Sequence, residues 1–198
     1  MFKTVSKPMG VLETNCYIIW LPEGEIIIDP GMDAAEWVIE NVQNPIAIFN
    51  THGHFDHVWS NCELQTKLKI PLYTPKPDIF MLLNDPFGYG MDSSVPDFEV
   101  KEDEKFEIGG TEVEFLHFPG HTPGCSAIKI DGALFSGDFI FKNSIGRTDF
   151  PYSSPKDMKK SILKFLKIKE NLKIYPGHGE STTVKAEQKS LPFWLNYL

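Results

Sequence analysis

Short apolar runs separated by turn-forming residues recur along the chain, a pattern typical of a strand-rich protein. Residues 15–20 and 25–29 form two such runs, and the Pro-Glu-Gly turn between them predicts a β-hairpin. Residues 46–50 are almost entirely apolar, as expected for a strand that is buried on both faces. A further strand is predicted over residues 70–74.

The second half of the chain repeats the hairpin pattern. Gly109-Gly110 and Asp131-Gly132 are turn sequences, and each lies between two runs with strand character. Residues 76–103, which precede these hairpins, are less regular, and the pattern assigns them no role. The strands predicted here cover residues 106–108 and 111–118, 125–130 and 133–136, and 172–175.

Helical segments lie between these strands. Asp33 is predicted to cap a helix that runs to about Val42, with Glu36 at the position that completes a capping box. Further helices are predicted over residues 57–68 and 155–167. Helices inserted between two groups of strands favour an α/β architecture in which the helices pack outside two sheets.

The length and the apolar pattern together set the broad class of protein. A chain of 198 residues suits one domain with a full hydrophobic core, so we expect a single domain over residues 1–198. Residues 1–10 include Lys3 and Lys7, but no apolar run follows them, which argues against a secretory signal peptide. No stretch is long enough to span a bilayer. We therefore expect a cytoplasmic protein without a membrane partner.

Charge and cysteine content exclude further classes. The net charge of −8 disfavours a nucleic-acid partner, because an acidic surface repels phosphate backbones. Bound metal ions would add local positive charge that this count leaves out, so a small anionic substrate stays open. Cys16, Cys62 and Cys125 lie far apart with no Cys-x-x-Cys pair, which predicts neither a disulfide framework nor a cysteine-rich zinc site.

The strongest chemical signal is Thr-His-Gly-His-Phe-Asp-His over residues 51–57, directly after the buried apolar strand. Residues i and i+2 of an extended loop project to the same side, so His52 and His54 can bind one cation. Asp56 and His57 follow a further bend and suit a second cation. Imidazoles with one carboxylate favour Zn²⁺, Fe or Mn²⁺ over Ca²⁺ and Mg²⁺, which prefer oxygen ligands.

Three later segments repeat the order of strand end, glycine and polar side chain. His121 lies in a loop with two glycines and two prolines, which makes a rigid mount for a ligand. Asp138 ends an apolar strand, where its carboxylate can bridge two cations, and His178 follows the last predicted strand. The repetition raises these residues above ordinary turn positions and predicts a metal centre.

The order HxHxDH, Gly-His, Gly-Asp and Gly-His-Gly resembles the signature of the metallo-β-lactamase fold. The resemblance covers nearly the whole chain, including residues 14–17 and 28–31, which are similar to the opening strands and turn of that family. The fold that it implies is a four-layer αβ/βα sandwich with the site at one edge. It also implies two divalent metal ions, Zn, Fe or Mn, held by seven residues. The first ion is assigned to His52, His54 and His121, the second to Asp56, His57 and His178, and the bridge to Asp138.

Residues 144–151, Ser-Ile-Gly-Arg-Thr-Asp-Phe-Pro, resemble the small bacterial glyoxalase II-like hydrolases. The resemblance implies that Arg147 meets the glutathione part of a substrate, and Lys142 in the same loop is a second candidate. Glyoxalase II usually has Lys-x-Tyr where this chain has Arg-Thr-Asp. The chain also ends soon after His178, so we expect it to lack the helical C-terminal domain with which full-length glyoxalase II binds glutathione.

The expected function is metal-dependent hydrolysis of a small-molecule thioester such as S-lactoylglutathione. Two neighbouring cations share a hydroxide and so supply a nucleophile at neutral pH. One of them polarises the carbonyl oxygen and offsets the developing oxyanion. Asp56 and Asp138 are the expected catalytic carboxylates, the first because it steers the hydroxide and the second because it bridges the cations.

The alternative is an oxidoreductase, because the same motifs and a similar Gly-Arg-Thr-Asp-Phe sequence occur in mononuclear iron persulfide dioxygenases. Such an iron would be held by His52 or its neighbour, by His121 and by Asp138. A diiron oxygen reductase is disfavoured, since such proteins usually carry Glu where His54 stands. The motifs alone do not decide between one metal ion and two.

Three further polar residues lie near the motifs. His117 precedes His121 by four positions, and we expect it to be a strand residue or a supporting residue rather than a ligand. Asp29 and Thr51 are placed either to orient ligands through hydrogen bonds or to stabilise their own turns.

Overall fold

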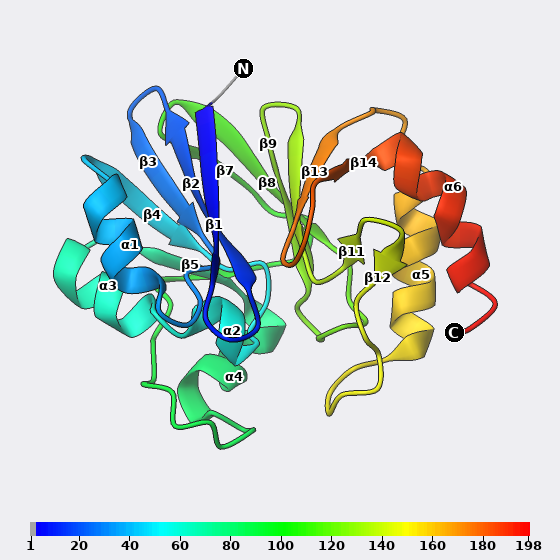
Figure 1. Ribbon diagram of the computed structural model, residues 1–198, viewed down its shortest axis with the longest axis horizontal. Helices are drawn as coiled ribbons and strands as arrows, with labels where there is room; N and C mark the ends of the chain where they lie inside the picture. The colour runs from blue at the N-terminus through cyan, green and yellow to red at the C-terminus, as the bar shows by residue number, and fades with distance from the viewer. Residues whose placement is uncertain (1–2) are drawn as a thin grey trace.

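Two six-stranded β-sheets pack face to face in the structure, a computed structural model that describes residues 3–198 (Figure 1). Residues 1–2, which begin the segment in which no signal peptide is expected, lie outside this range. The first sheet contains, in spatial order, β1 (Lys3–Met9), β2 (Thr14–Leu21), β3 (Gly24–Ile28), β4 (Pro45–Phe49), β5 (Leu72–Pro75) and β6 (Phe98–Val100). The second contains β14 (Thr182–Thr183), β13 (Lys173–Pro176), β10 (Ala133–Gly137), β9 (Ser126–Ile130), β8 (Thr111–His117) and β7 (Lys105–Ile108).

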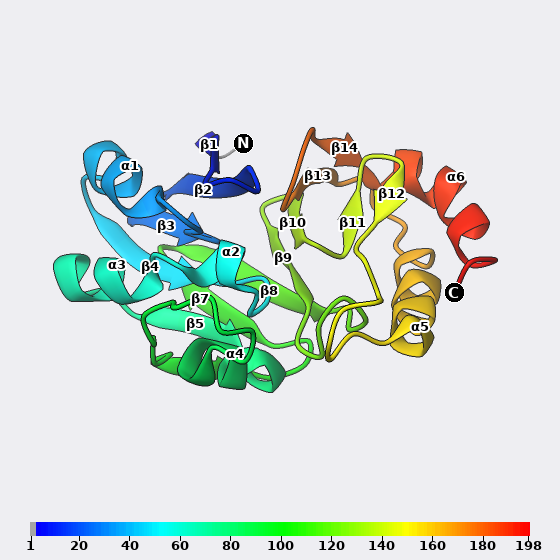
Figure 2. The same ribbon diagram turned by 60° about the horizontal axis from the view of Figure 1, so that its bottom comes forward.

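Helices cover the outer face of each sheet, which completes the four-layer αβ/βα sandwich. Both views place α1 (Ala34–Asn41) and α3 (Asn61–Leu68) outside the first sheet, and α5 (Pro155–Phe165) and α6 (Val184–Trp194) outside the second (Figure 1, Figure 2). The remaining elements are the short helices α2 (Phe55–Val58), η1 (Lys76–Asp78) and α4 (Ile79–Asn84), and the small hairpin of β11 (Ile140–Phe141) and β12 (Ser144–Ile145).

Alternation along the central strands builds three apolar layers. In β3, Ile26 and Ile28 enter the core between the sheets, whereas Ile27 packs beneath α1 and α3. In β10, Phe135 enters the same intersheet core and Leu134 packs beneath α5 and α6. Because both faces of these strands are covered, nearly every position is apolar, which explains the continuous apolar runs in the sequence.

The strands and hairpins predicted from the sequence are confirmed, but the helix expected over residues 57–68 is wrong as a single element. It is two helices, α2 and α3, and Ser60 lies at the break. The Ser60 amide donates to the Pro30 carbonyl at 2.9 Å, and its hydroxyl donates to the Gly31 carbonyl at 2.7 Å. Ser60 therefore stabilises the turn after β3 instead of continuing the helix.

The capping box at the start of α1 is also wrong. Asp33 does occupy the capping position, but its backbone has a φ of 63° and its side chain makes no capping hydrogen bond. The Ala34 amide instead donates to the Gly31 carbonyl at 3.2 Å. The helix start is thus fixed by the turn backbone rather than by a side chain.

Several elements have no clear signal in the sequence. Strand β1 is largely exposed and carries a polar pattern, and its seven-residue pairing with β2 is what makes it a strand. Helix α6 contains Pro192, which hides its helical pattern. It is capped by Thr183, whose hydroxyl accepts from the Ala186 amide. Among the described residues, none of the helices is long and apolar enough to cross a membrane.

Candidate metal centre

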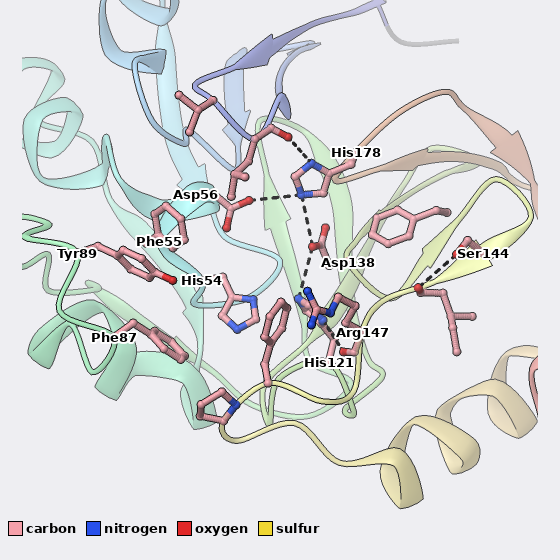
Figure 3. A pocket seen from close by; sticks show the side chains of 16 residues that line it. His54, Phe55, Asp56, Phe87, Tyr89, His121, Asp138, Ser144, Arg147 and His178 are labelled. Carbon is pink, nitrogen blue, oxygen red and sulfur yellow. Dashed lines mark hydrogen bonds and ion pairs between the residues drawn. The ribbon is translucent and has the colours of Figure 1, made fainter. Parts of the chain in front are cut away.

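Loops at one edge of the sandwich bring all seven predicted ligands together. Figure 3 shows the five that line a cavity, His54, Asp56, His121, Asp138 and His178. The segment from residue 51 to α2 follows β4 of the first sheet, and it carries four of them. His121 follows β8, Asp138 follows β10 and His178 follows β13, all in the second sheet. The site therefore lies between the two halves of the fold, and each sheet supplies part of it.

Three groups of side chains have the spacing of metal-ligand sets, and one of them joins Asp29 to His52 and His57. His52, His54 and His121 each offer one ligand atom, and these atoms lie within 4.8 Å of one another. Asp56, His57 and His178 form a second such group at the same spacing. These are the two sets assigned from the sequence, so the structure brings together the residues that the motifs paired.

Asp138 lies between the two groups. Its Oδ2 is 3.4 Å from Nε2 of His121 in the first group and 3.4 Å from Nε2 of His178 in the second. Its Oδ1 is 3.3 Å from Nε2 of His57. A carboxylate in this position can reach a cation in either group.

The hydrogen bonds of the histidines aim their free nitrogens at the centre. Nδ1 of His121 bonds to the Arg147 carbonyl at 2.8 Å, and Nδ1 of His178 bonds to the Leu12 carbonyl at 3.0 Å. A carbonyl only accepts, so both rings carry their proton on Nδ1 and present an unprotonated Nε2 to the site when neutral. Such second-atom hydrogen bonds are characteristic of metal-binding histidines.

Buried polar atoms without hydrogen-bond partners gather at the centre of the site. In the described residues these include Nε2 of His52, His57 and His121 and Oδ1 of Asp138, all at the centre of the site. Leaving buried polar atoms unpaired is costly, and a cation coordinated by them removes that cost. The donor set thus fits divalent metal ions that accept nitrogen ligands.

Asp29 supports both groups from beneath. Its Oδ2 accepts from Nδ1 of His57 at 2.9 Å and from the Thr51 hydroxyl at 2.6 Å, and its Oδ1 accepts from the Thr51 amide at 2.8 Å. The Thr51 oxygen lies 3.1 Å from Nδ1 of His52. One buried carboxylate therefore orients a histidine of each group, and of the two roles considered for Asp29 and Thr51 the structure favours ligand orientation.

Burial and neighbouring charges set the protonation of the site. Burial lowers the pKa of His54 to about 3, with the His121 ring adding to the effect, so His54 is neutral, the form that binds metals. Burial raises the pKa of Asp56, but the charge of His57 and a hydrogen bond with His178 outweigh it and hold the pKa at about 2. Burial opposes protonation of His57 and His178, but the neighbouring carboxylates outweigh it and raise the pKa of His57 well above its usual range and that of His178 to about 9. Because a cation requires neutral imidazole and ionised carboxylate, metal binding would displace the protons of these two rings.

Close packing at glycines holds the carboxylates in place. A Cβ at Gly177 would lie 2.1 Å from Oδ1 of Asp138, and one at Gly146 would lie 1.8 Å from the Asp138 carbonyl oxygen. A Cβ at Gly31 would lie 1.8 Å from the Asp56 carbonyl oxygen. Because no side chain fits at these positions, the glycines beside the ligands are a requirement of the geometry.

Asp78, in η1, is a supporting residue that the sequence analysis missed. Its buried carboxylate accepts from the Gly53 amide at 2.9 Å, the Thr122 hydroxyl at 2.6 Å and the Gly124 amide at 2.6 Å. Gly53 lies in the first ligand loop, whereas Thr122 and Gly124 follow His121. Asp78 thus ties together the two loops that carry the first histidine group, and no local motif marks it in the irregular segment 76–103.

A cavity of 790 Å³ opens beside both groups. Its floor includes the ligands Asp56, His121 and Asp138, and much of its wall is apolar. Figure 3 shows the rings of Phe55, Phe87 and Tyr89 on one side of His54, and Arg147 on the opposite side. A substrate in this cavity can reach both histidine groups.

The two predicted substrate-binding cations differ in position. Arg147 lines the cavity, but its guanidinium makes two hydrogen bonds to Asp149, at 2.9 and 2.7 Å, and lies 4.1 Å from the centre of the Phe150 ring. Lys142 is outside the lining and pairs with Glu180 at 2.5 Å.

His117 does not join the described ligand groups, in keeping with its expected supporting role. It ends strand β8, and its Nε2 lies 2.9 Å from the Pro123 carbonyl oxygen. Its ring therefore stabilises the loop that carries His121.

The chain belongs to the metallo-beta-lactamase superfamily, which matches residues 9–178 and whose members bind divalent metal ions. This result confirms the fold family named from the motifs. A curated relative, the hydroxyacylglutathione hydrolase GloC of Haemophilus influenzae, is 34% identical over 94% of this chain and 95% of its own length.

Solved structures agree over nearly the whole length. The BLEG-1 B3 metallo-beta-lactamase is 31% identical, with a TM-score of 0.86 over 96% of this chain and 99% of the other. TTHA1623, solved in a di-iron-bound form, is 30% identical, with a TM-score of 0.84 over the same shares. ETHE1 from Myxococcus xanthus is 20% identical with a TM-score of 0.77, over 99% of this chain and 85% of that one, and it shares the fold.

Proposed function

We propose that this protein is a binuclear metallohydrolase that cleaves thioesters of the S-lactoylglutathione type. The observation that carries the proposal is the position of Asp138 between two complete ligand groups, within 3.4 Å of a histidine nitrogen in each. The likeness to a hydroxyacylglutathione hydrolase, GloC, supports the choice of substrate. The roles of the seven ligands, of Asp56 and Asp138 in catalysis and of Arg147 in binding are part of this proposal.

The seven ligands would hold two divalent cations, which when bound would supply a hydroxide at neutral pH and polarise the thioester carbonyl. Asp56 is held by the Thr14 hydroxyl, which donates to its Oδ2 at 2.7 Å, and the same oxygen lies 3.4 Å from Nε2 of His57 and 3.3 Å from Nε2 of His178. We assign Asp56 the task of orienting the attacking water. In the hydrolysis, the water oxygen bonds to the acyl carbon and the carbon–sulfur bond breaks. The thiolate takes up a proton that the attacking water releases, so the products are a carboxylic acid and a thiol.

Arg147 is proposed to meet a carboxylate of the thiol carrier at the mouth of the cavity. Its side chain is 63% exposed, so a carboxylate can approach it without burying charge. Arginine binds carboxylates through two parallel hydrogen bonds, the geometry that it already makes with Asp149. Substrate must therefore compete with Asp149 for this cation.

Metal analysis beside two assays tests the proposal against the dioxygenase alternative. We expect close to two metal ions per chain and hydrolysis of S-lactoylglutathione, measured by thiol release. A single tightly bound iron, together with oxygen consumption when glutathione persulfide is the substrate, would instead establish the oxidoreductase. A β-lactam is included as a third substrate because of the likeness to BLEG-1, and cleavage of the β-lactam alone would contradict the thioesterase.

A further inference from the structure

Exposed apolar side chains gather at the mouth of the metal cavity. Val11 and Leu12 from the β1–β2 turn are 82% and 49% exposed, Tyr89 is 53% exposed, and Phe150 is 37% exposed. All four line the cavity. Exposed apolar residues are normally scattered singly over a protein surface. Their concentration at one opening therefore indicates a binding surface.

Phe55, Phe87 and Tyr89 form a continuous surface, here called the aromatic wall. The ring centres of Phe55 and Tyr89 are 4.0 Å apart, and those of Phe87 and Tyr89 are 6.0 Å apart. The wall reaches the metal centre, since the Phe87 ring lies edge-on to His54 at 5.8 Å. Phe150 flanks the same histidine at 5.9 Å. A group bound beside His54 is thus placed among aromatic rings.

The charges around the cavity do not suit a polar group at this wall. Arg147 is the one lysine or arginine side chain in the cavity lining of the described residues, and Asp149 already pairs with it. The carboxylates in the lining are Asp56 and Asp138, both held at the metal centre. A charged group at the aromatic wall would lose its water without gaining a partner.

We propose that the aromatic wall binds the acyl group of the substrate, so that the preferred thioesters carry a bulky apolar acyl group, aromatic above all. This inference rests on the proposed thioester hydrolysis and names its substrate class. Thiol carriers such as glutathione are polar and charged, so the carrier extends past Arg147 into solvent. The apolar side of the cavity is then left for the acyl side chain.

S-mandeloylglutathione and S-lactoylglutathione provide a matched test. They share the carrier, the thioester and the α-hydroxyl, and differ by a phenyl group in place of a methyl group. We expect kcat/KM to be about ten-fold higher for the mandeloyl compound, since burying most of a phenyl ring is worth about that factor. The ratio is first divided by the ratio of the two rates of uncatalysed hydrolysis by hydroxide, which removes the difference in intrinsic reactivity.

Phe87→Ala and Tyr89→Ala should bring this ratio towards one, because they should lower kcat/KM for the mandeloyl compound more than kcat/KM for the lactoyl compound. Both residues lie in the irregular segment after α4. Phe87 is partly buried and packs against the core beneath α1 and α3, whereas Tyr89 is 53% exposed, so Tyr89→Ala is the variant that leaves the core intact. Phe193→Ala is the control, because Phe193 is an exposed aromatic residue on α6 away from the cavity lining. It should leave the ratio unchanged. As a binding readout, mandelate should inhibit the wild type more strongly than lactate, and Tyr89→Ala should remove the difference.

A wild-type ratio of one or less, or a ratio unchanged in both wall variants, overturns the inference. If S-lactoylglutathione is hydrolysed without such a preference, the thioesterase stands and only the acyl class is wrong. If the metal-loaded protein cleaves neither thioester, the proposed function fails and the inference fails with it.

Discussion

At the scale of single residues, Asp29 is the carboxylate on which the orientation of both histidine groups depends. Its backbone has a φ of 50°, which asparagine tolerates, so Asp29→Asn preserves the turn. An amide has one acceptor oxygen in place of two, so asparagine cannot accept from the His57 ring and the Thr51 hydroxyl at one atom and from the Thr51 amide at the other, as the carboxylate does. We expect metal affinity to fall about 10- to 100-fold, as measured by competition with a chelator of known affinity.

Asp33→Asn is the matched control, since Asp33 is an exposed aspartate with a similar φ of 63°. It should bind metal like the wild type. If Asp29→Asn keeps wild-type affinity at both sites, hydrogen bonding to Asp29 does not orient the ligands.

Asp138 should be essential because it alone reaches both groups. Asp138→Ala should abolish hydrolysis and lower the metal content below about one ion per chain, as measured by elemental analysis. His117→Ala should change the rate by less than about two-fold, since the His117 ring contacts the Pro123 carbonyl rather than the cavity. Full metal content in Asp138→Ala would refute the bridging role.

Asp78 should make stability depend on pH. Burial raises the pKa of Asp78 to about 6, although hydrogen bonds from Thr122, Gly124 and Gly53 oppose the shift. A carboxyl whose pKa is raised by folding contributes stability below its unfolded pKa and loses that stability as pH rises through the folded value. Between pH 4 and pH 7 the contribution should fall by about 2 kcal/mol.

Urea unfolding of chelated wild type and Asp78→Asn isolates this contribution. The free energy of unfolding of the wild type, relative to that of the variant, should be about 2 kcal/mol larger at pH 4 than at pH 7, because only the wild type carries the titrating group. A stability difference that stays constant with pH would show that Asp78 remains ionised throughout the range.

At the scale of elements, the loop between β12 and α5 combines two tasks. The Arg147 carbonyl orients His121, and the Arg147 side chain pairs with Asp149 at the mouth of the cavity. If the guanidinium meets the carrier carboxylate, Arg147→Ala should raise KM for S-lactoylglutathione by about two- to five-fold with kcat less changed. Asp149→Asn should lower KM, because it frees the cation.

Lys142→Ala is the control for the loss of positive charge, since Lys142 pairs with Glu180 outside the cavity lining. It should leave KM unchanged. A rise in KM for Asp149→Asn equal to that for Arg147→Ala, together with loss of metal, would mean that the pair only braces the loop around His121.

The same elements show what the sequence could predict. His52, His54 and Asp56 were predictable because their spacing within one loop is local, and the buried strand before them is continuous and apolar. Asp78 was not predictable, since its partners Gly53 and Thr122 are far away in the chain. The aromatic wall was missed for the same reason, as its rings meet only when the segment after α4 folds over α2. The helix break at Ser60 likewise depends on a carbonyl from a distant turn.

At the scale of the whole molecule, the metal centre joins the two halves of the sandwich. His52 and His57 come from the first sheet, and His121, Asp138 and His178 come from the second. A cation bound by ligands from both halves stabilises the folded state but not the unfolded chain, in which these ligands are scattered. Metal removal should therefore affect global stability as well as activity.

We expect chelation to lower Tm by about 5–10 °C, since a ligand at a hundred times its Kd contributes about 2.7 kcal/mol in a chain of this size. Zn²⁺ or Mn²⁺ should restore Tm, whereas Mg²⁺ should not, because nitrogen ligands dominate the site. Asp138→Ala should show a smaller shift than the wild type, since it lacks the carboxylate that reaches both groups. If Tm does not change although elemental analysis shows that the metal is gone, the two sheets hold the ligands in place by packing alone. The orphaned histidine nitrogens would then be tolerated within the fold rather than compensated by metal.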